Sequence, residues 1–454
     1  MKKLLSIILI AAICSALFIG CGRNNSGNDT TATSSVYLLN FKPEIESAWN
    51  DIAKAYKEEK GVDLKVVTAA SGTYETTLKS EMAKEDAPAI FVVNGPVGLE
   101  SWKDYCADLK NTELYNMLSD KSMALTSDDK VLAIPYTVEG YGIIYNNAIM
   151  NKYFASSKKT TPYTSMDEIK NFEALKAIVE DMTKNCLDEL GIQGVFSSTS
   201  LASGEQWRWQ SHLANVPFYY EFLKDKSYDS TILKGLNSPT VDFSYADNFK
   251  NIFDLYINNS VTKPSMLSNV TVETSMSEFA LGQSAMVQNG NWAASQILEV
   301  KGNTVNAADI KFLPIYTGIA GEESQGLCVG TENNFSINSK LSEEKQKAAL
   351  DFLVWLFSSD TGKQIALKQM DFIAPFNTFT SDELPEDPLS QEVMKWMNKD
   401  GITSIQWTFN AFPSDAFKNY FGDVLLEYAQ GQKTWDQVKK TVVDAWASEY
   451  KATK

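Results

Sequence analysis

Apolar and polar positions alternate along the N-terminal part of the chain in a pattern that predicts strands separated by helices. Short apolar runs with the length of buried strands lie at residues 36–41, 62–68 and 89–93. Apolar residues recur at helical spacing in the stretches between them, at 42–60 and 71–82. Gly61 is placed to end the first helix, because glycine adopts a left-handed backbone without strain. Strands that alternate with helices predict an α/β lobe with a largely parallel sheet.

Asn94 follows the third predicted strand directly, in the sequence Asn94-Gly95-Pro96. Ligands of open α/β sheets bind beyond the carboxyl ends of the strands, which makes Asn94 a candidate cleft residue. The same tripeptide is also ordinary turn chemistry, so a purely structural role for Asn94 stays open.

The segment Ser277–Trp292 combines a helix end, a strand and a turn. The apolar stripe of a short helix consists of Met276, Phe279 and Ala280. Gly282 is expected to end this helix, residues 284–287 to form a buried strand, and Asn289-Gly290-Asn291 to form a turn. The turn would present Trp292 at the end of the strand, where an aromatic face can line a cleft and Asn291 lies beside it. Packing of Trp292 inside a buried corner is the alternative.

The order F-x-x-G-x-x-A-M-x-x-x-G-x-W in this segment resembles the signature of family-1 extracellular solute-binding proteins, the maltose-binding-protein-like receptors of ABC sugar importers. The matching residues are Phe279, Gly282, Ala285, Met286, Gly290 and Trp292. In that family the tryptophan after the glycine turn stacks on sugar, so the resemblance implies this role for Trp292. Residues 134–146 and 326–362 resemble two further blocks of the family, and the resemblance extends from Val36 to the end of the chain.

The resemblance also implies further ligand contacts. Residues 134–146 resemble the crossover strand in which an acid, here Glu139, hydrogen-bonds sugar hydroxyls; a solvated carboxylate is the alternative. Glu205-x-Trp207 resembles an acid-x-aromatic pair that contacts sugar, and an uncertain register leaves Trp209 as a competitor of Trp207. Relatives place cleft aromatics near the C-terminal helices, which adds two candidates, Trp407 and Tyr420.

Arg208 lies within the same stretch and is the only arginine after Arg23. Its guanidinium keeps its charge and offers a planar fork of donors. It could bind sugar hydroxyls, or a carboxylate if the ligand is a uronic acid. A salt bridge to one of the many acidic residues is the structural alternative.

The first residues of the chain have the pattern of a targeting segment. Lys2 and Lys3 precede a long apolar run that ends in Gly20-Cys21. A small residue before a cysteine resembles the bacterial lipobox, which implies removal of a signal peptide at 1–20, lipidation of Cys21 and a polar tether at 21–35. The alternative, a membrane-spanning anchor, would use an apolar run shorter than the ~20 residues that a bilayer requires.

Charge and cysteine content narrow the function classes. Acidic residues number 57 against 41 basic ones, for a formal net charge of −16. Loss of Lys2 and Lys3 with the signal peptide would take this to −18, which argues against a nucleic-acid partner, since such partners need a clustered basic surface. The remaining cysteines, Cys106, Cys186 and Cys328, lack metal-ligand spacing, so buried free thiols are expected, although one disulfide stays open.

The sequence offers no catalytic set with a recognisable pattern. His212 is the only histidine, and no H-E-x-x-H, G-x-S-x-G or phosphate-binding glycine motif occurs. We therefore expect neither an enzyme nor a cofactor. A carbohydrate-active hydrolase that uses two carboxylates stays open, as does a receptor for a polyamine, or for ferric ion at Tyr219-Tyr220.

Together these features predict a two-lobed α/β fold of the type II periplasmic-binding-protein kind, with a mixed, mostly parallel sheet in each lobe and a ligand cleft between the lobes. The expected boundaries are 36–137 and 317–371 for the first lobe and 138–316 and 372–454 for the second, with crossover strands near Glu139, Pro314–Thr317 and Phe372–Pro375. The resemblance implies a monomeric lipoprotein on the outer face of the bacterial cytoplasmic membrane. It would capture a carbohydrate, an oligosaccharide of unspecified linkage, and deliver it to an ABC permease.

Overall fold

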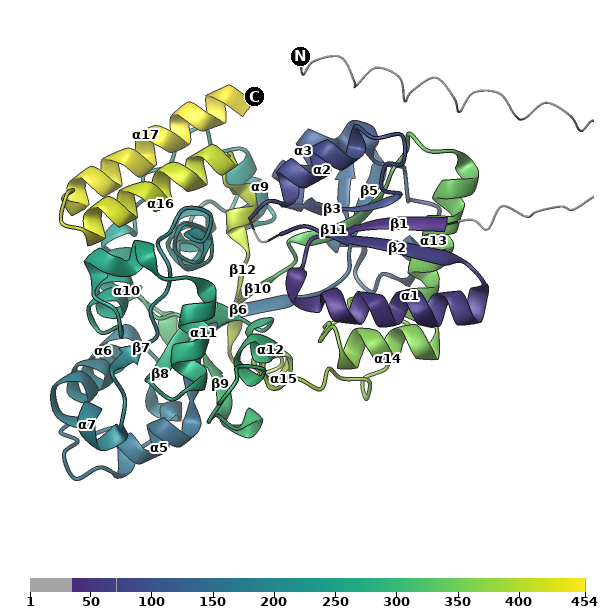
Figure 1. The fold of residues 1–454 in the computed structure, drawn as a ribbon. Coiled ribbons are helices and arrows are strands. Elements are labelled where there is room, and N and C mark those ends of the chain that lie inside the picture. Colours follow the sequence, from purple (N-terminus) through teal and green to yellow (C-terminus); the bar gives the residue numbers. More distant parts are fainter. Residues whose placement is uncertain (1–34, 71, 454) are drawn as a thin grey trace, which may run out of the picture. The chain divides into compact units, whose positions relative to one another are not determined.

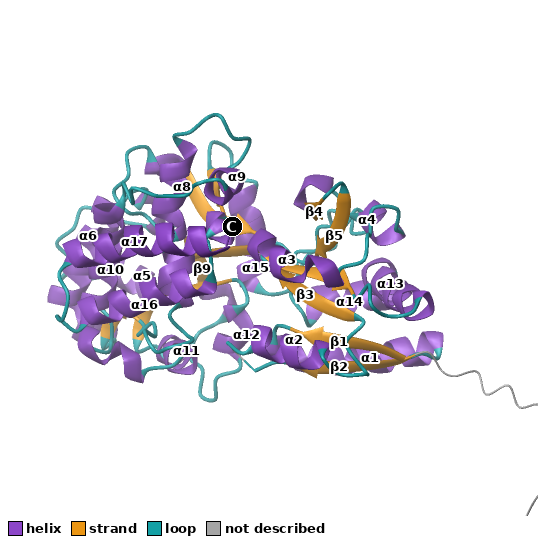
Figure 2. Cartoon of the chain, turned by 90° about the horizontal axis from the view of Figure 1, so that it is seen from above, coloured by secondary structure: helices purple, strands orange, loops and turns teal. Residues whose placement is uncertain are grey.

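The computed structural model describes residues 35–70 and 72–453, and these residues build two β-sheets, each with its own hydrophobic core and flanking helices. Figure 1 shows the course of the chain through both sheets, and Figure 2 shows the strands flanked by helices. The predicted signal peptide, Cys21 and the tether up to residue 34 lie outside the described residues, whereas Ser35, predicted as the end of the tether, begins strand β1 (Ser35–Asn40). We call the part built on the N-terminal sheet the first lobe and the part built on the other sheet the second lobe.

The sheet of the first lobe has the strand order β2-β1-β3-β11-β5-β4. Its strands are β1 (Ser35–Asn40), β2 (Asp63–Thr68), β3 (Ile90–Asn94), β4 (Leu125–Ser127), β5 (Lys130–Pro135) and β11 (Asn333–Ile337). Strand β1 pairs in parallel with β2 and β3, whereas β11 pairs antiparallel with β3 and β5. The three predicted N-terminal strands are therefore present and parallel.

The helices of the first lobe cover this sheet with their apolar faces. They include α1 (Glu46–Lys60), α2 (Tyr74–Met82), α3 (Gly95–Trp102), α4 (Glu113–Met117), α13 (Glu343–Ser358) and α14 (Asp360–Lys368). Helix α1 buries Trp49, Ile52 and Tyr56 and ends at Gly61, whose φ is +70°. Helix α13 brings Trp355 against Tyr56, so segments far apart in sequence share one core. Figure 1 shows both helices beside the first-lobe sheet.

The sheet of the second lobe has the order β12-β10-β6-β8-β7, with β9 also paired to β6. Its strands are β6 (Glu139–Asn146), β7 (Gly194–Phe196), β8 (Ser284–Gly290), β9 (Ile310–Leu313), β10 (Gln325–Gly330) and β12 (Thr403–Gln406). The helices that accompany it are α5 (Asn147–Ala155), α6 (Phe172–Asp181), α7 (Leu187–Leu190), α8 (Asn215–Leu223), α9 (Thr231–Leu236), α10 (Ala246–Asn258), α11 (Val272–Ala280), α12 (Ala293–Leu298), α15 (Pro388–Met397), α16 (Asp415–Ala429) and α17 (Trp435–Thr453).

Three fold-level predictions need correction. Among the strand pairs of the described residues, two of the five in each sheet are parallel, so both sheets are mixed but not mostly parallel. Strand β10, expected in the first lobe, pairs with β6 and β12 in the second sheet. The predicted crossover at Pro314–Thr317 stays within the second lobe, because Ile315, Tyr316 and Ile319 belong to its core.

The chain passes between the two sheets at other places. Strand β5 ends at Pro135 in the first sheet and β6 begins at Glu139 in the second, as predicted for that segment. It returns between β10 and β11, at residues 331–332. Near the third predicted crossover, the Val138 amide donates to the Ile373 carbonyl at 2.8 Å, while Phe372 and Phe376 pack in the first-lobe core.

The segment that carries Trp292 differs from its prediction in one respect. Helix α11 ends before Gly282, whose φ is +69°, as expected. Strand β8 continues through Gly290, however, so Asn289 and Gly290 are strand residues rather than part of a turn. Pairing of β8 with β6 through Gly290 extends the strand beyond the apolar run that defined it in the sequence.

The expected state of the three remaining cysteines can be compared with the structure. Cys106, Cys186 and Cys328 are buried free thiols. Within residues 35–70 and 72–453, no helix is long and apolar enough to cross a membrane.

Candidate functional site

Trp292 lies where strand β8 leads into helix α12, and its ring is half-buried. The indole folds back over Gly290, since a Cβ at that position would lie 2.1 Å from Cζ3 of Trp292. Gly290 is therefore needed for close approach of the ring to its own backbone. The sequence pattern G-x-W has a direct steric explanation here.

Aromatic rings from three separate segments surround Trp292. We call this group the aromatic cluster; it consists of Tyr141, Trp207, His212, Trp292 and Trp407. Ring centroids of the other four lie between 5.8 and 6.4 Å from that of Trp292. Trp207 and Trp292 are the two half-buried tryptophans of the cluster, whereas Trp407 is only 1% exposed. The half-buried pair is the part of the cluster that can offer ring faces to a ligand.

Side chains of the first lobe meet the aromatic cluster at Lys42, which follows strand β1. Its Nζ lies 2.5 Å from Oε1 of Glu139 and 5.3 Å from the centroid of the Trp292 ring. Asn333, at the start of β11, donates from Nδ2 to Oε2 of Glu139 at 3.3 Å. These three first-lobe and crossover residues, together with the aromatic cluster, form what we call the junction site.

A small cavity of about 20 Å³ opens within the junction site, enough for about one water molecule. Its lining includes Lys42, Glu139, Asn291, Trp292 and Asp371. Burial by itself lowers the pKa of the Lys42 ammonium, but the charges of Glu139 and Glu44 outweigh burial and raise it above its ordinary value. Lys42 is therefore a buried cation with two carboxylate partners.

Arg208 sits on the second-lobe side of the site, in a π-helical segment at Arg208–Leu213. Its guanidinium carbon lies 4.0 Å from the centroid of the Trp207 ring. Arg208 is 4% exposed and forms no ion pair with any described residue, so the predicted salt-bridge alternative is wrong. Short π-helical segments occur frequently at functional sites, because they aim side chains that a regular helix would turn away.

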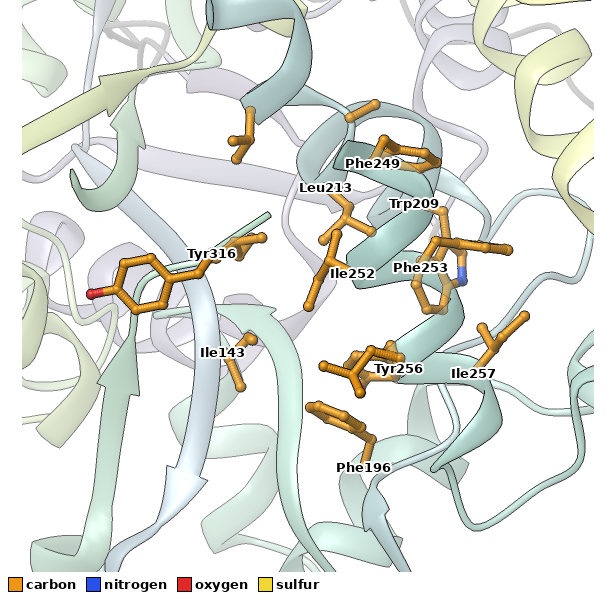
Figure 3. Packing of buried hydrophobic residues seen from close by; sticks show 14 of the residues in the cluster. Ile143, Phe196, Trp209, Leu213, Phe249, Ile252, Phe253, Tyr256, Ile257 and Tyr316 are labelled. Carbon is orange, nitrogen blue, oxygen red and sulfur yellow. The ribbon is translucent and has the colours of Figure 1, made fainter. Parts of the chain in front are cut away.

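The remaining predicted site residues divide into three groups. Trp209 is fully buried and packs edge-on against Phe253 and Tyr256 (Figure 3). Its Nε1 donates to the Ser200 carbonyl. Trp209 is therefore a core residue, and Trp207 remains as the candidate ligand-binding aromatic of this segment. Asn291 is buried and holds the Gly140 amide and the Ser390 hydroxyl. Tyr420 lies on α16 with 52% of its surface exposed, so its side chain points largely into solvent.

Glu205 and Asn94 lie near the site in different ways. Glu205 is half-buried and accepts a hydrogen bond from the Val272 amide at the start of α11. Asn94 ends strand β3, directly opposite Asn333 in the register of the first sheet. Its buried Oδ1 has no hydrogen-bond partner. A ligand role for both residues, as for Glu139, stays a prediction.

Buried polar atoms without a hydrogen-bond partner gather around the junction site. They include Nε of Arg208, Nδ1 of His212, Nε2 of Gln288, Nε1 of Trp407, and Oδ1 of both Asn94 and Asn333. An unsatisfied buried polar atom costs about 1–3 kcal/mol, so proteins rarely keep several in one place without a functional reason. Donors and acceptors without partners thus lie on both lobes around the junction site.

Lys42, Tyr141, His212 and Asn333 belong to the site but were not predicted, and neither was Gln288, whose Oε1 accepts from the Tyr141 hydroxyl. One signal was available for Lys42, because it follows the first strand of the lobe just as Asn94 follows the third, and the same rule about strand ends applies to both. Gln288 and Asn289 lie next to each other within a buried strand, where amide side chains are themselves unusual.

The sequence profile described as bacterial extracellular solute-binding protein matches residues 51–392. The chain belongs to this family. The solute-binding protein is also similar in fold to a chitin oligosaccharide binding protein (TM-score 0.69, 18% identity), with 93% of this chain and all of that chain covered. No curated protein matches the chain by sequence at a significant level.

Two further solved structures have the same fold. One is the solute-binding protein RafE in complex with raffinose, with a TM-score of 0.66 and 16% identity. The match covers 92% of this chain and 99% of that chain. RafE from Streptococcus pneumoniae is also known in its ligand-free form. The other is a sugar transporter from Bacillus licheniformis in complex with stachyose, with a TM-score of 0.64, 17% identity, and 91% and 100% covered. At these identities the likeness establishes the two-lobed fold.

The carboxyl groups of Glu332 and Asp371, near the junction site, are expected to make the stability of the solute-binding protein depend on pH. Burial raises the pKa of Glu332 from 4.5 to about 7 and that of Asp371 from 3.8 to about 7. Between about pH 4 and pH 7 these two carboxyl groups keep their protons in the folded chain and lose them in the unfolded chain. The free energy of unfolding therefore falls as pH rises from about 4 to 7.

Neutral variants isolate this contribution. We expect Asp371→Asn and Glu332→Gln each to be more stable than the wild type above pH 7 and equal to it near pH 4, because the uncharged amide has no desolvation cost that grows with pH. Asparagine also tolerates the left-handed backbone at Asp371, where φ is +55°. Denaturant unfolding at several pH values measures the effect. Parallel pH profiles for variants and wild type would show that neither carboxyl is perturbed.

Proposed function

We propose that this solute-binding protein captures an oligosaccharide at the junction site and delivers it to the permease of an ABC transporter. The half-buried pair Trp207 and Trp292 carries this proposal, with ring centroids 6.0 Å apart and unpartnered polar atoms on both lobes around them. A saccharide needs both features, because each pyranose ring has apolar C–H faces and a rim of hydroxyl groups.

The two lobes give the capture a physical mechanism. Trp207 and Trp292 would hold the sugar ring, while Asn94 and Asn333 from the first lobe and Gln288 from the second bind hydroxyl groups. Only a closed arrangement makes both sets of contacts, so ligand binding favours closure. The permease then recognises the closed form. The ligand leaves unchanged, and the protein acts as a receptor rather than an enzyme.

Attachment to the membrane completes the proposal. The lipobox-like sequence ending at Cys21 supports a monomeric lipoprotein whose tether up to residue 34 holds the folded part outside the cytoplasmic membrane. Family membership supports the extracellular location of the solute-binding part. The neighbours in complex with raffinose and stachyose support a carbohydrate ligand.

The other candidate functions have weaker support. A polyamine receptor needs free carboxylates, yet Glu139 is already bound to Lys42 and Asn333. For ferric ion, the Tyr220 hydroxyl donates to Gln325, and the described residues contain no group of histidine, cysteine and acidic side chains able to hold a metal. A hydrolase would need two carboxylates in fixed catalytic roles, and Glu139, which lies beside the aromatic cluster, is already bound to Lys42 and Asn333.

A ligand panel tests the proposal. The purified full-length protein is heated with neutral and acidic oligosaccharides, spermidine and ferric citrate. A ligand present at 100 times its dissociation constant adds about 2.7 kcal/mol of stability, so the true ligand raises the melting temperature. We expect only oligosaccharides to do so, and chromatography of the recovered sugar to show no cleavage. Stabilisation by spermidine or iron alone would contradict the proposal, and so would a cleaved sugar.

A further inference from the structure

Arg208 is unusual because it is a buried cation without an ion-pair partner among the described residues. It is the only arginine among the described residues of a chain with 57 acidic side chains. Only 4% of its surface is exposed. No described carboxylate lies within ion-pair distance, and Nε has no hydrogen-bond partner. Arginine is almost never fully buried unless it is paired.

No described acidic group around Arg208 forms an ion pair with it. The charges of Glu205 and Glu273 favour the charged guanidinium from a distance, but burial outweighs them and lowers its pKa. Glu205 accepts from the Val272 amide, and Glu273 is exposed on α11. Burial raises the pKa of the Tyr141 and Tyr256 phenols above their ordinary value, so both stay protonated. Burial, and then the charge of Arg208, lower the pKa of His212 well below its ordinary value, so the imidazole is neutral.

Lys42 provides the contrast within the same site. It is equally buried, but Glu139 and Glu44 lie 2.5 and 3.4 Å from its Nζ. One of the two cations at the junction site is therefore balanced and the other is not. The free energy cost of an unpaired buried charge is several kcal/mol, and an anionic group on the ligand would offset it.

The position and shape of the Arg208 side chain indicate which class of anion it could bind. The guanidinium lies against Trp207, so a sugar ring that packs on the exposed faces of Trp207 and Trp292 would bring a ring substituent to its edge. The planar fork fits a carboxylate with two parallel hydrogen bonds. A phosphate carries close to two negative charges and would leave one unbalanced, because Lys42 is already paired.

We propose that the ligand is an acidic oligosaccharide and that Arg208 binds the carboxylate of its uronic-acid unit. This inference rests on the proposed saccharide-binding function and specifies its substrate class. Trp207 and Trp292 bind the ring faces, and Arg208 sets the preference for charge.

Matched ligands test the proposal without altering the protein. Binding of trigalacturonate and of glucuronic-acid-substituted xylotriose to the full-length protein is measured by calorimetry, each beside its carboxyl-reduced, neutral form. We expect the acid form of at least one pair to bind 10-fold or more tightly than its reduced form. Equal or tighter binding of the neutral forms would overturn the proposal while leaving the saccharide function intact. A preference for sulfated or phosphorylated sugars over carboxylates would also overturn it.

Variants of Arg208 then locate the preference. Arg208→Gln should abolish the difference between acid and reduced sugars, and Arg208→Lys should keep part of it, because lysine supplies charge without the fork. Lys440→Gln, which removes an exposed charge on α17, serves as the control and should keep the full preference. Melting temperatures confirm folding. Persistence of the full preference in a folded Arg208→Gln protein would show that another group reads the charge. Failure of every saccharide to bind would instead refute the proposed function itself.

Discussion

Replacement of Trp292 by alanine is expected to weaken oligosaccharide binding by about 2 kcal/mol or more, roughly 30-fold in the dissociation constant. The substitution removes the ring that lies at the centre of the aromatic cluster and lines the cavity. Trp292→Phe should retain part of the affinity, since a smaller ring still offers a face for stacking. Isothermal titration calorimetry measures both variants against the stabilising sugar found by the ligand panel.

A matched control separates stacking from general loss of packing. Trp396 is also half-buried, but it lies on α15 and donates from Nε1 to the Phe312 carbonyl, away from the aromatic cluster. Trp396→Ala should lower the melting temperature without changing the dissociation constant. If Trp292→Ala remained folded and bound the sugar with unchanged affinity, Trp292 would not belong to the binding surface.

Replacement of Glu139 by glutamine is expected to destabilise the fold by about 3 kcal/mol. The change leaves Lys42 buried and charged, with only Glu44 at 3.4 Å as a carboxylate partner. Adding Lys42→Met should restore most of the stability, because the double variant contains no uncompensated charge at this place. Denaturant unfolding of the wild type, the two single variants Glu139→Gln and Lys42→Met, and the double variant gives the coupling energy of the Lys42–Glu139 pair.

An exposed ion pair provides the comparison. Lys347 and Asp351 lie 2.6 Å apart on α13, with exposed fractions of 74% and 55%. Asp351→Asn should change stability by less than about 1 kcal/mol, because water screens this pair. An equally small effect of Glu139→Gln, with no recovery in the double variant, would mean that the Lys42–Glu139 pair contributes little to stability.

Local sequence pattern predicted those parts of the fold that depend on neighbours along the chain. The three N-terminal strands, helix α1 ending at Gly61, and the helix end at Gly282 follow from apolar spacing and glycine chemistry. The family resemblance supplied the two-lobed arrangement. Local pattern could not predict which sheet each strand joins, because β10 and β11 are close in sequence yet belong to different sheets.

The candidate site was predicted in its aromatic part and missed in its charged part. Trp292 and Trp207 were found through motifs, but the choice between Trp207 and Trp209 depended on the π-helical segment that follows, which no spacing rule anticipates. Lys42 and Glu139 are 97 residues apart, so only the folded structure brings them together. The unpaired state of Arg208 is likewise a property of its surroundings, not of its sequence position.

The central claim, that the face of Trp207 and Trp292 binds the saccharide, can be observed directly. Fluorine NMR of the full-length protein labelled with 5-fluorotryptophan, with resonances assigned by single Trp→Phe variants, reports on each indole during titration with the stabilising oligosaccharide. We predict large shifts for Trp207 and Trp292, and none for Trp49 and Trp446, which are buried in the two cores. Saturable binding that leaves the resonances of Trp207 and Trp292 unchanged would contradict the account.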